Sequence, residues 1–393
     1  MTVRVSKPEF NLREKISELD KPTGLHGNEI LKSETPQDTF DLVGTGRKNM
    51  VINGDMRISQ RYGTDENTPE NNKLTLDQMR YDVSQGSKLK VQQVTDAPAG
   101  FSHSMKVTSL AATSPGVNDF FLLQNFIEGN NTERLGWGTS DAQTVTLSFY
   151  VKSSITGTHA CGIRNKAYNR GNTQTYTINN ANTWEKKTVT FPGDTTGTWE
   201  TGVEAGLKIN FDLGSGSNFQ AASTGTWLAT NDFITSDSVK VIGTNAATWY
   251  ITGIQLETGK LATPFEHRSF GEELALCQRY FFRLKAASNY SAYGMGGAYS
   301  STQAVVLIHF PVPLRALPAF TKAGNDSIYY DKVGGGGSFT NFSITQHMGT
   351  TTTGVTHLEL LIIGSFTAGN PFILSSNNNT STHFNFDAEI PSS

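Results

Sequence analysis

Charged residues are scarce in this sequence of 393 residues. They make up 17% of the chain, and 32 basic residues against 35 acidic ones leave a formal net charge of −3. A chain without basic excess has no global electrostatic attraction to nucleic acid, so we predict no nucleic-acid partner. Hydrophobic residues, at 36%, are also below the usual level of a globular domain. The length nevertheless predicts two or three domains.

Cysteine and long apolar runs are nearly missing. The two cysteines, Cys161 and Cys277, stand far apart without metal-ligand spacing, so we expect neither a disulfide nor a metal site from them. Both are predicted to be small buried hydrophobic residues. No apolar run reaches membrane-spanning length, and residues 1–15 lack the apolar core of a signal peptide. We therefore expect no membrane insertion, and synthesis in a cytoplasm.

The chain is rich instead in Thr, Ser, Asn and Gly, with 38 glycines. This composition is typical of many short strands joined by tight polar turns. Strand signals occur at 88–94, 104–107, 144–152, 188–191, 207–213 and 248–256. Asn53-Gly54, between apolar runs, predicts a β-hairpin. We therefore predict a mainly β protein in which residues 51–265 form an antiparallel jelly-roll or β-sandwich body.

Two tryptophans of this body, Trp199 and Trp227, lie in Gly- and Thr-rich loops. A loop tryptophan can stack on a sugar ring, because it combines a large apolar face with an N–H donor. The alternative, which we favour for each, is a ring folded over the edge of its own sheet. Trp184 and Trp249 lie in strand contexts and are predicted to pack in the core.

A connecting helix is predicted at 266–285, between two β-rich modules. Ser269 and Glu272 form an S-x-x-E capping box at its start. An apolar stripe follows at 3-4-3 spacing: Leu274, Cys277, Phe281 and Leu284. Such a stripe must be buried, either against the chain's own domains or against further copies of the chain. These four residues are the predicted domain joint and oligomer contact.

Residues 1–50 have a different character and are predicted to form a short α-helical arm. Leu12, Ile16 and Leu19 share one face of a short amphipathic helix, and Thr35 caps a second helix. Helices this short are marginal alone in water and need a partner surface. The side chains expected to attach the arm to a larger assembly are Phe10, Leu12, Ile16, Leu19, Phe40 and Leu42. The alternative is a packed extension of the next domain.

Residues 286–393 are predicted to form a small C-terminal β-sandwich with strands at 304–310, 356–364 and 370–376. Pro311 and Pro313 are expected to stop the first of these strands. Exposed tyrosines offer a large contact area at little entropic cost, which makes them efficient recognition residues. Five crowd the predicted Gly- and Ser-rich loops: Tyr290, Tyr293, Tyr299, Tyr329 and Tyr330. Receptor binding and packing at subunit contacts both remain open for them.

Catalytic motifs are missing, so we predict that the protein is not an enzyme. Glu200 and Glu204 share a segment, but their spacing alone does not make them an acid and a base. His347 and His357 stand ten residues apart, without close ligand spacing. We predict no cofactor.

Several segments resemble proteins of tailed bacteriophages. KPEFNLREKISELDKPTG and TPQDTFDLVGTGRKNMVINGDM resemble the N-terminal segments of short-tailed phage fibre and appendage proteins. PFEHRSFGEELALCQRYF is similar to a segment of tail-fibre proteins, and FPVPLRALPAF with FNFDAEI is similar to compact fibre-tip domains. VTLSFYVKSS, NTWEKKTVTFPG and TWYITGIQLETGKLATPFEHR resemble jelly-roll domains related to carbohydrate-binding modules.

The resemblance implies a homotrimeric, non-catalytic tail fibre located on the virion. Its arm would bind phage tail or adaptor proteins, and its distal domains would bind a host-surface glycan or protein. The resemblance also allows a structural calcium ion in the jelly roll. Two alternatives remain: a virion adaptor, head fibre or decoration protein without a receptor, and a glycan-hydrolysing tailspike. The chain is short and lacks the regular repeats of the β-helix on which such hydrolases are usually built.

Overall fold

A computed structural model describes residues 47–323, 328–331, 337–339, 343–349, 353–376 and 380–391, without side chains between 323 and 353. The described chain is mainly β, which confirms the predicted fold class. The predicted attachment residues Phe10, Leu12, Ile16, Leu19, Phe40 and Leu42 lie outside the described residues, so the helical arm stays a prediction. In the described part, no helix is both long and apolar enough to cross a membrane.

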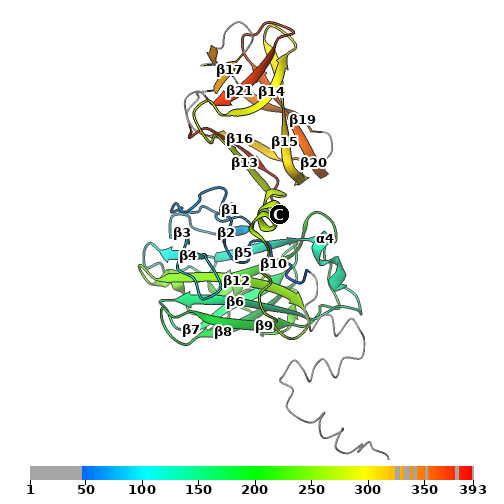
Figure 1. Cartoon of the computed structure of the whole chain (residues 1–393). Helices are drawn as coiled ribbons and strands as arrows, with labels where there is room; N and C mark the ends of the chain where they lie inside the picture. Colours follow the sequence, from blue (N-terminus) through cyan, green and yellow to red (C-terminus); the bar gives the residue numbers. More distant parts are fainter. Residues whose placement is uncertain are drawn as a thin grey trace, which may run out of the picture.

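The body is a sandwich of two antiparallel sheets (Figure 1). The seven-stranded sheet has the order β1 (Lys73–Leu74), β2 (Met79–Val83), β5 (Phe121–Glu128), β10 (Ala205–Asp212), β7 (Gly157–Arg164), β8 (Gly171–Ile178) and β11 (Trp227–Leu228). The five-stranded sheet has the order β3 (Leu89–Val94), β4 (Ser104–Ser109), β12 (Thr248–Thr258), β6 (Val145–Ser153) and β9 (Glu185–Phe191). Short helical turns interrupt the loops: α4 (Gly129–Thr132), η1 (Glu133–Leu135), η2 (Ser217–Phe219) and η3 (Val241–Gly243).

The core of the body lies between these sheets. Phe149 of the smaller sheet meets Phe211 of the larger one edge-on, with ring centroids 5.0 Å apart, and Trp249 packs on Phe211 at 5.9 Å. Alternate residues of each strand point into this layer because side chains in a strand point to opposite faces in turn. Cys161 is buried here, as predicted.

The C-terminal module is a second antiparallel sandwich (Figure 1). Its small sheet has the order β13 (Phe281–Lys285), β22 (His383–Asp387) and β16 (Ala319–Ala323). Its large sheet has the order β18 (Gly337–Phe339), β17 (Ile328–Asp331), β21 (Pro371–Ser376), β14 (Ala292–Ala298), β15 (Gln303–Ala316), β20 (Thr353–Ile363) and β19 (Ser343–Gly349). Phe384 and Phe386 of the small sheet and Leu360 of the large one share its core.

The predicted strands in both modules are confirmed, but two local predictions are wrong. The Asn53-Gly54 turn exists without flanking strands, because the backbone around it bonds elsewhere: Met50 donates to the carbonyl of Leu256, and Ile254 donates to that of Gly54. The prolines also do not end β15. The pairing of β15 with β20 shifts register between His309 and Leu314, so Pro311 and Pro313 fall in a bulge that needs no ladder donor.

The connecting helix is shorter than predicted. Helix α5 covers Phe270–Gln278, and its predicted cap is confirmed on one side, since the Ser269 hydroxyl accepts from the Glu272 amide at 3.3 Å. The prediction of a helix to residue 285 is wrong. Phe281 and Leu284 lie in β13, where they pair with Asp387 and Phe384 of β22. Aromatic residues favour a strand when a partner strand offers its edge.

Of the predicted stripe, only Leu274 and Cys277 are therefore on the helix. Cys277 is fully buried, as predicted, and Leu274 is half-buried. Phe281 is also buried, and Leu284 packs against the core of the C-terminal module from β13. The four residues belong to the joint within the chain; their role in an oligomer stays a prediction.

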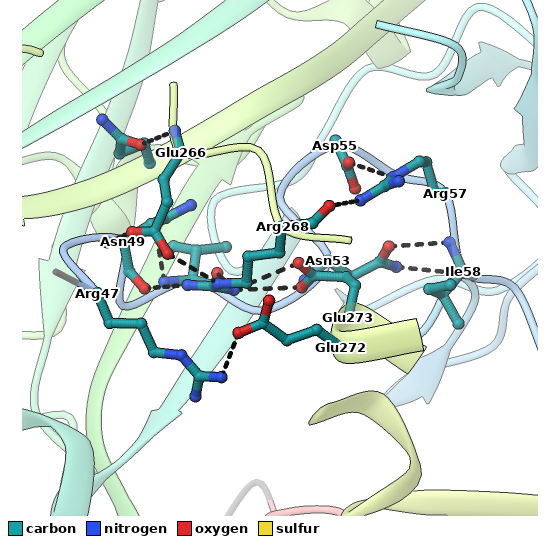
Figure 2. Close-up of polar contacts among 12 residues, drawn as sticks. Arg47, Asn49, Asn53, Asp55, Arg57, Ile58, Glu266, Arg268, Glu272 and Glu273 are labelled. Atoms are coloured by element: carbon teal, nitrogen blue, oxygen red, sulfur yellow. Dashed lines mark hydrogen bonds and ion pairs between the residues drawn. The ribbon is translucent and has the colours of Figure 1, made fainter. Parts of the chain in front are cut away.

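Arg268 links the start of α5 to residues 49–51, where the body begins (Figure 2). Its Nε donates to Glu266 at 3.1 Å, its Nη1 donates to Glu273 at 3.3 Å and to the Val51 carbonyl at 3.2 Å, and its Nη2 donates to the Asn49 carbonyl. Glu266 in turn accepts from the amide of Asn49 at 2.7 Å. Every polar group of this buried arginine is thus partnered, which fixes the direction of the helix.

A buried ionic network joins the two modules. Arg61 of the body lies 3.1 Å from Asp387 and 3.2 Å from Glu389, and its guanidinium stacks 3.7 Å from the ring centroid of Phe281. Asp77 lies on the other side of the same guanidinium at 3.9 Å. Because these carboxylates come from both modules, one arginine neutralises charge from each side of the joint.

Candidate functional site

A cleft of about 200 Å³ opens on the outer face of the seven-stranded sheet of the body. It combines aromatic rings with polar side chains, which is the usual lining of a small-molecule site. Its lining residues are Asn72, Asp82, Phe120, Leu122, Arg164, Tyr168, Phe219, Asn231 and Phe233. Its volume is below the roughly 300 Å³ of pockets that enclose a drug-sized ligand, so it suits one ring or one substituent.

Strand alternation places the polar floor of this cleft. In β10, Ile209 and Phe211 enter the core, so Lys208 and Asn210 point to the outer face. In β7, Ile163 enters the core and Arg164 points outward, directly opposite Lys208 in the strand register. The sheet therefore sets two cations side by side on its outer face.

Aromatic rings from the loops form the walls. Phe219 and Phe233 stack with their centroids 4.7 Å apart and their planes at 21°, and Phe120 meets Phe219 edge-on at 5.8 Å. The Phe233 amide donates to the carbonyl of Phe219 at 3.0 Å, which ties the two loop segments together. This layer covers the outer face and excludes water from its polar floor.

Arg164 lies between two rings, 4.9 Å from the centroid of Tyr168 and 4.7 Å from that of Phe233. Its side chain is 2% exposed, and burial lowers its pKa to about 10. Nη1 donates to the side-chain carbonyl of Asn231, whereas Nε and Nη2 have no hydrogen-bond partner among the described residues. A buried guanidinium with two unpartnered nitrogens is costly, and such a group is a marker of a ligand site.

Lys208 lies opposite Arg164 on the outer face of the sheet and adds positive charge beside the cleft. Its Nζ lies 3.6 Å from the Tyr168 ring centroid and donates to the Lys166 carbonyl at 3.2 Å. Burial, followed by the positive charges of Arg164 and Arg80, lowers the pKa of Lys208 to about 7. Burial also raises the pKa of Asp82, the carboxylate that lines the cleft.

Two side-chain amides lie on the same outer face, outside the lining of the cleft. Gln124 of β5 and Asn210 of β10 face each other in the register, and both are fully buried. Neither amide has a hydrogen-bond partner among the described residues.

The loop tryptophans singled out in the sequence do not line this cleft. Trp199 and Trp227 pack with Trp137 in a three-ring cluster whose centroids lie 4.7–5.3 Å apart. Their ring nitrogens donate within the chain, that of Trp227 to the Pro192 carbonyl at 2.9 Å and that of Trp199 to Asp194 at 3.2 Å. Both rings pack against the core of the body, which is the alternative that the sequence favoured.

The tyrosines of the C-terminal module divide into different environments. Tyr293 is buried and its hydroxyl donates to the Thr382 carbonyl at 2.8 Å, so its prediction as a recognition residue on a loop is wrong. Tyr290 and Tyr299 are more than half exposed and stay predicted receptor contacts. Tyr329 and Tyr330 lie in strand β17 and not in a loop.

Metal ligands do not gather in the described part of the chain: no group of three or more His, Cys, Asp or Glu residues there could hold an ion. The structural calcium therefore stays a prediction. His357 is opposite His309 across β15 and β20, with ring centroids 5.9 Å apart, and the side chain of His347 lies outside the described residues.

Sequence reasoning missed the cleft, although one signal for it was present. The segment LKINFD alternates apolar and polar residues, and this pattern predicts that Lys208 and Asn210 share the outer face. From alternation alone, the outer face would be predicted to be exposed to solvent. Alternation does not reveal that loops near residues 168, 219 and 233 fold over it.

No protein-family model and no curated protein matches the chain. Among solved structures, it is similar to the enzymatically active domain of bacteriophage CBA120 tailspike protein 4, with 14% identity and a TM-score of 0.26 over 53% of this chain and 21% of that chain. A family 11 carbohydrate-binding module of Clostridium thermocellum cellulase Lic26A-Cel5E matches with 13% identity and a TM-score of 0.27, over 51% of this chain and 99% of that chain. A sugar-binding protein from Bacteroides thetaiotaomicron, described as putative, matches with 10% identity and a TM-score of 0.29, over 54% and 100%. The chain thus spans about a fifth of the tailspike structure.

Proposed function

We propose that the protein is a saccharide-binding appendage of a tailed-phage virion, and that the cleft of the body holds the sugar. The observation that carries this proposal is the combination of stacked rings, Phe219 and Phe233, with an unsatisfied polar floor. A sugar ring presents apolar C–H faces to aromatic rings and hydroxyl groups to amides and cations. The cleft offers partners for both kinds of surface.

Binding without hydrolysis fits the lining better than catalysis does. Glycoside hydrolysis ordinarily needs two carboxylates that flank the scissile bond. Asp82 is the one carboxylate among the described lining residues. The hydrolysing tailspike is therefore the weaker alternative.

The place on the virion rests on the resemblance of the sequence segments to phage fibre and appendage proteins. In this proposal the N-terminal arm binds tail or adaptor proteins, and the body and C-terminal module face the host surface. Several weak sugar sites on one particle would give high avidity. An adaptor or a head decoration protein is the competing function, and it would leave the cleft without a host ligand.

We also propose that copies of the chain associate through the C-terminal module, as a homotrimer. The outer face of its large sheet carries four apolar side chains that are 38–72% exposed: Met295, Leu307, Ile363 and Ile373. Met295 pairs in register with both Leu307 and Ile373, so these three form one continuous patch. A contiguous exposed apolar patch marks an interaction site, and other copies of this chain are the occupant we propose.

The saccharide proposal is tested by screening the full chain against a glycan array with two matched variants. Phe219→Ala removes one wall of the cleft, and Tyr299→Ala removes an exposed ring of the C-terminal module. We expect Phe219→Ala to lose binding and Tyr299→Ala to keep it. The opposite result would place recognition on the C-terminal module, and no binding by the natural protein would favour the adaptor.

A further inference from the structure

The outer face of the seven-stranded sheet holds more positive than negative charge at the cleft. Arg80, Lys208 and Arg164 come from β2, β10 and β7, and their exposed fractions are 7%, 0% and 2%. Asp82 is the carboxylate whose charge reaches Arg164. Like charges directly opposite each other on neighbouring strands are destabilising, as are buried charges without partners. A stable sheet with this arrangement points to an anion that completes it.

Arg164 presents the edge that recognises such an anion. A guanidinium binds a carboxylate best through two parallel N–H groups. Nε and Nη2 form one such pair of donors, and both lack a hydrogen-bond partner among the described residues. Arg80, by comparison, already donates to the Ile390 carbonyl at 2.7 Å and to the Asn72 side chain at 3.1 Å. Arg164 is therefore the arginine left to bind a ligand.

Asn231 lines the cleft beside this arginine and holds its third nitrogen. Its side-chain carbonyl accepts from Nη1 of Arg164, and it lies in a loop whose neighbours Ala229 and Thr230 are exposed. Hydrogen bonds in which the donor or the acceptor is ionised are about twice as strong as those between neutral groups. A carboxylate that accepts from Nε and Nη2 would therefore gain free energy, while the Asn231 amide keeps Nη1.

We propose that the saccharide recognised by this cleft is acidic, and that Arg164 binds the carboxylate of a uronic acid unit. This inference rests on the proposed function of the cleft. The stacked rings Phe219 and Phe233 would contact the sugar ring, while the carboxylate reaches the guanidinium between Tyr168 and Phe233. A neutral sugar would leave Nε and Nη2 of Arg164 unpartnered in the bound state.

The test is titration calorimetry of the full chain with galacturonate and galactose oligomers, which differ in a carboxylate at one carbon. We expect galacturonate to bind at least about tenfold more tightly, because sites built around a polar group reject ligands that lack it. Galactose 6-phosphate serves as a third probe. Tighter binding of the phosphate ester than of the uronate would overturn the assignment of a carboxylate.

Two variants test the role of Arg164 independently of the ligand series. Asn231→Asp would place a carboxylate on Nη1 of the guanidinium and neutralise its charge within the chain, so we expect it to raise thermal stability and to weaken uronate binding. Arg164→Gln is expected to abolish the preference for uronate, with Arg134→Gln, an exposed arginine, as its control. If Arg164→Gln does not fold, Asn231→Asp alone decides the matter.

The possible failures are distinguishable. Equal affinity for both sugars, unchanged in Asn231→Asp, would overturn the acidic-sugar inference and leave the saccharide-binding function standing. Absence of binding to any saccharide on the array would overturn both.

Discussion

The two modules share one architecture and differ in how the outer face of the larger sheet is covered. In the body, loops carrying Phe219 and Phe233 fold over part of that face, and the buried Arg164 lies against them. In the C-terminal module, among the described residues, the corresponding face carries the exposed side chains of Met295 and Leu307. The comparison teaches that a sandwich fold does not by itself decide a function. What covers the outer face does.

Under the proposed function, this difference reverses the roles that the sequence indicated. The tyrosines suggested recognition in the C-terminal module, whereas the unsatisfied buried polar groups found in the described part of the chain lie in the body. An apolar face lacks the directional hydrogen bonds that discriminate between sugars, so it suits association better. A cleft with a polar floor suits the recognition of a small polar ligand.

The largest expected effect comes from making the apolar face polar. The double variant Met295→Glu and Leu307→Glu would place like charges at the proposed contact between copies, where burying them is unfavourable. We expect the assembly to change from trimer to monomer in light scattering coupled to size exclusion. Val117→Glu, at an exposed apolar residue of the body, is the control and should leave the trimer intact. A natural protein that is monomeric at tens of micromolar would disprove association through this face.

The second effect concerns the joint that holds the two modules together. Arg61→Ala leaves Asp77, Asp387 and Glu389 without their shared cation, and breaking one partner of a buried pair costs about 3–5 kcal/mol. Denaturant unfolding of the full chain should show this loss. Arg47→Ala, which breaks an exposed pair with Glu272, should cost less than about 1 kcal/mol. Equal losses in the two variants would contradict a joint based on Arg61.

The third effect is a pH dependence of the body. The pKa of Lys208 falls from 10.5 to about 7 on folding, because burial and then the charges of Arg164 and Arg80 disfavour its proton. Between pH 7 and 10 the unfolded chain binds more protons at this residue, so its contribution to the free energy of unfolding rises with pH. The slope is at most about 1.4 kcal/mol per pH unit.

Lys208→Met removes this titration. Charged and titratable groups around it are Arg80, Asp82, Arg164, Lys166 and Tyr168. The difference in unfolding free energy between the natural protein and the variant should therefore change across pH 7–10 in denaturant titrations. A difference that stays constant over this range would show that Lys208 keeps its ordinary pKa.

The smallest expected effect is at the cap of α5. Ser269→Ala removes the acceptor of the Glu272 amide and should cost about 1 kcal/mol. Ser269→Asp keeps an acceptor there and should retain most of the stability. Thermal unfolding measures the stability of both variants. If Ser269→Asp loses as much stability as Ser269→Ala, the cap does not stabilise α5.

Alternation in the sequence predicted the strands that have one buried face and one more exposed face. In β3 and β4 the regular alternation of side chains identified strands close to their observed bounds. Strand β5 escaped this reasoning because its segment FLLQNFIE is buried on both faces. Helix α5 began at its predicted cap but ended early, because residues 281–285 form strand β13, whose partner strand β22 is distant in sequence.

The candidate site was out of reach for a related reason. Arg164 and Asn231 are ordinary polar residues in the sequence, and their contact spans 67 positions. Trp199 and Trp227 attracted attention because a loop tryptophan is visible in one short segment. Local patterns reveal residue types, whereas a cleft arises from loops that close over a sheet.

The central claim is that the cleft of the body, and not the C-terminal module, holds the saccharide. A crystal structure of the full chain soaked with the glycan that binds best on the array tests this claim most directly. We predict electron density for one sugar unit beside Phe219, with its carboxylate on Arg164. Density against Tyr299 or Tyr290, with an empty cleft, would contradict the claim.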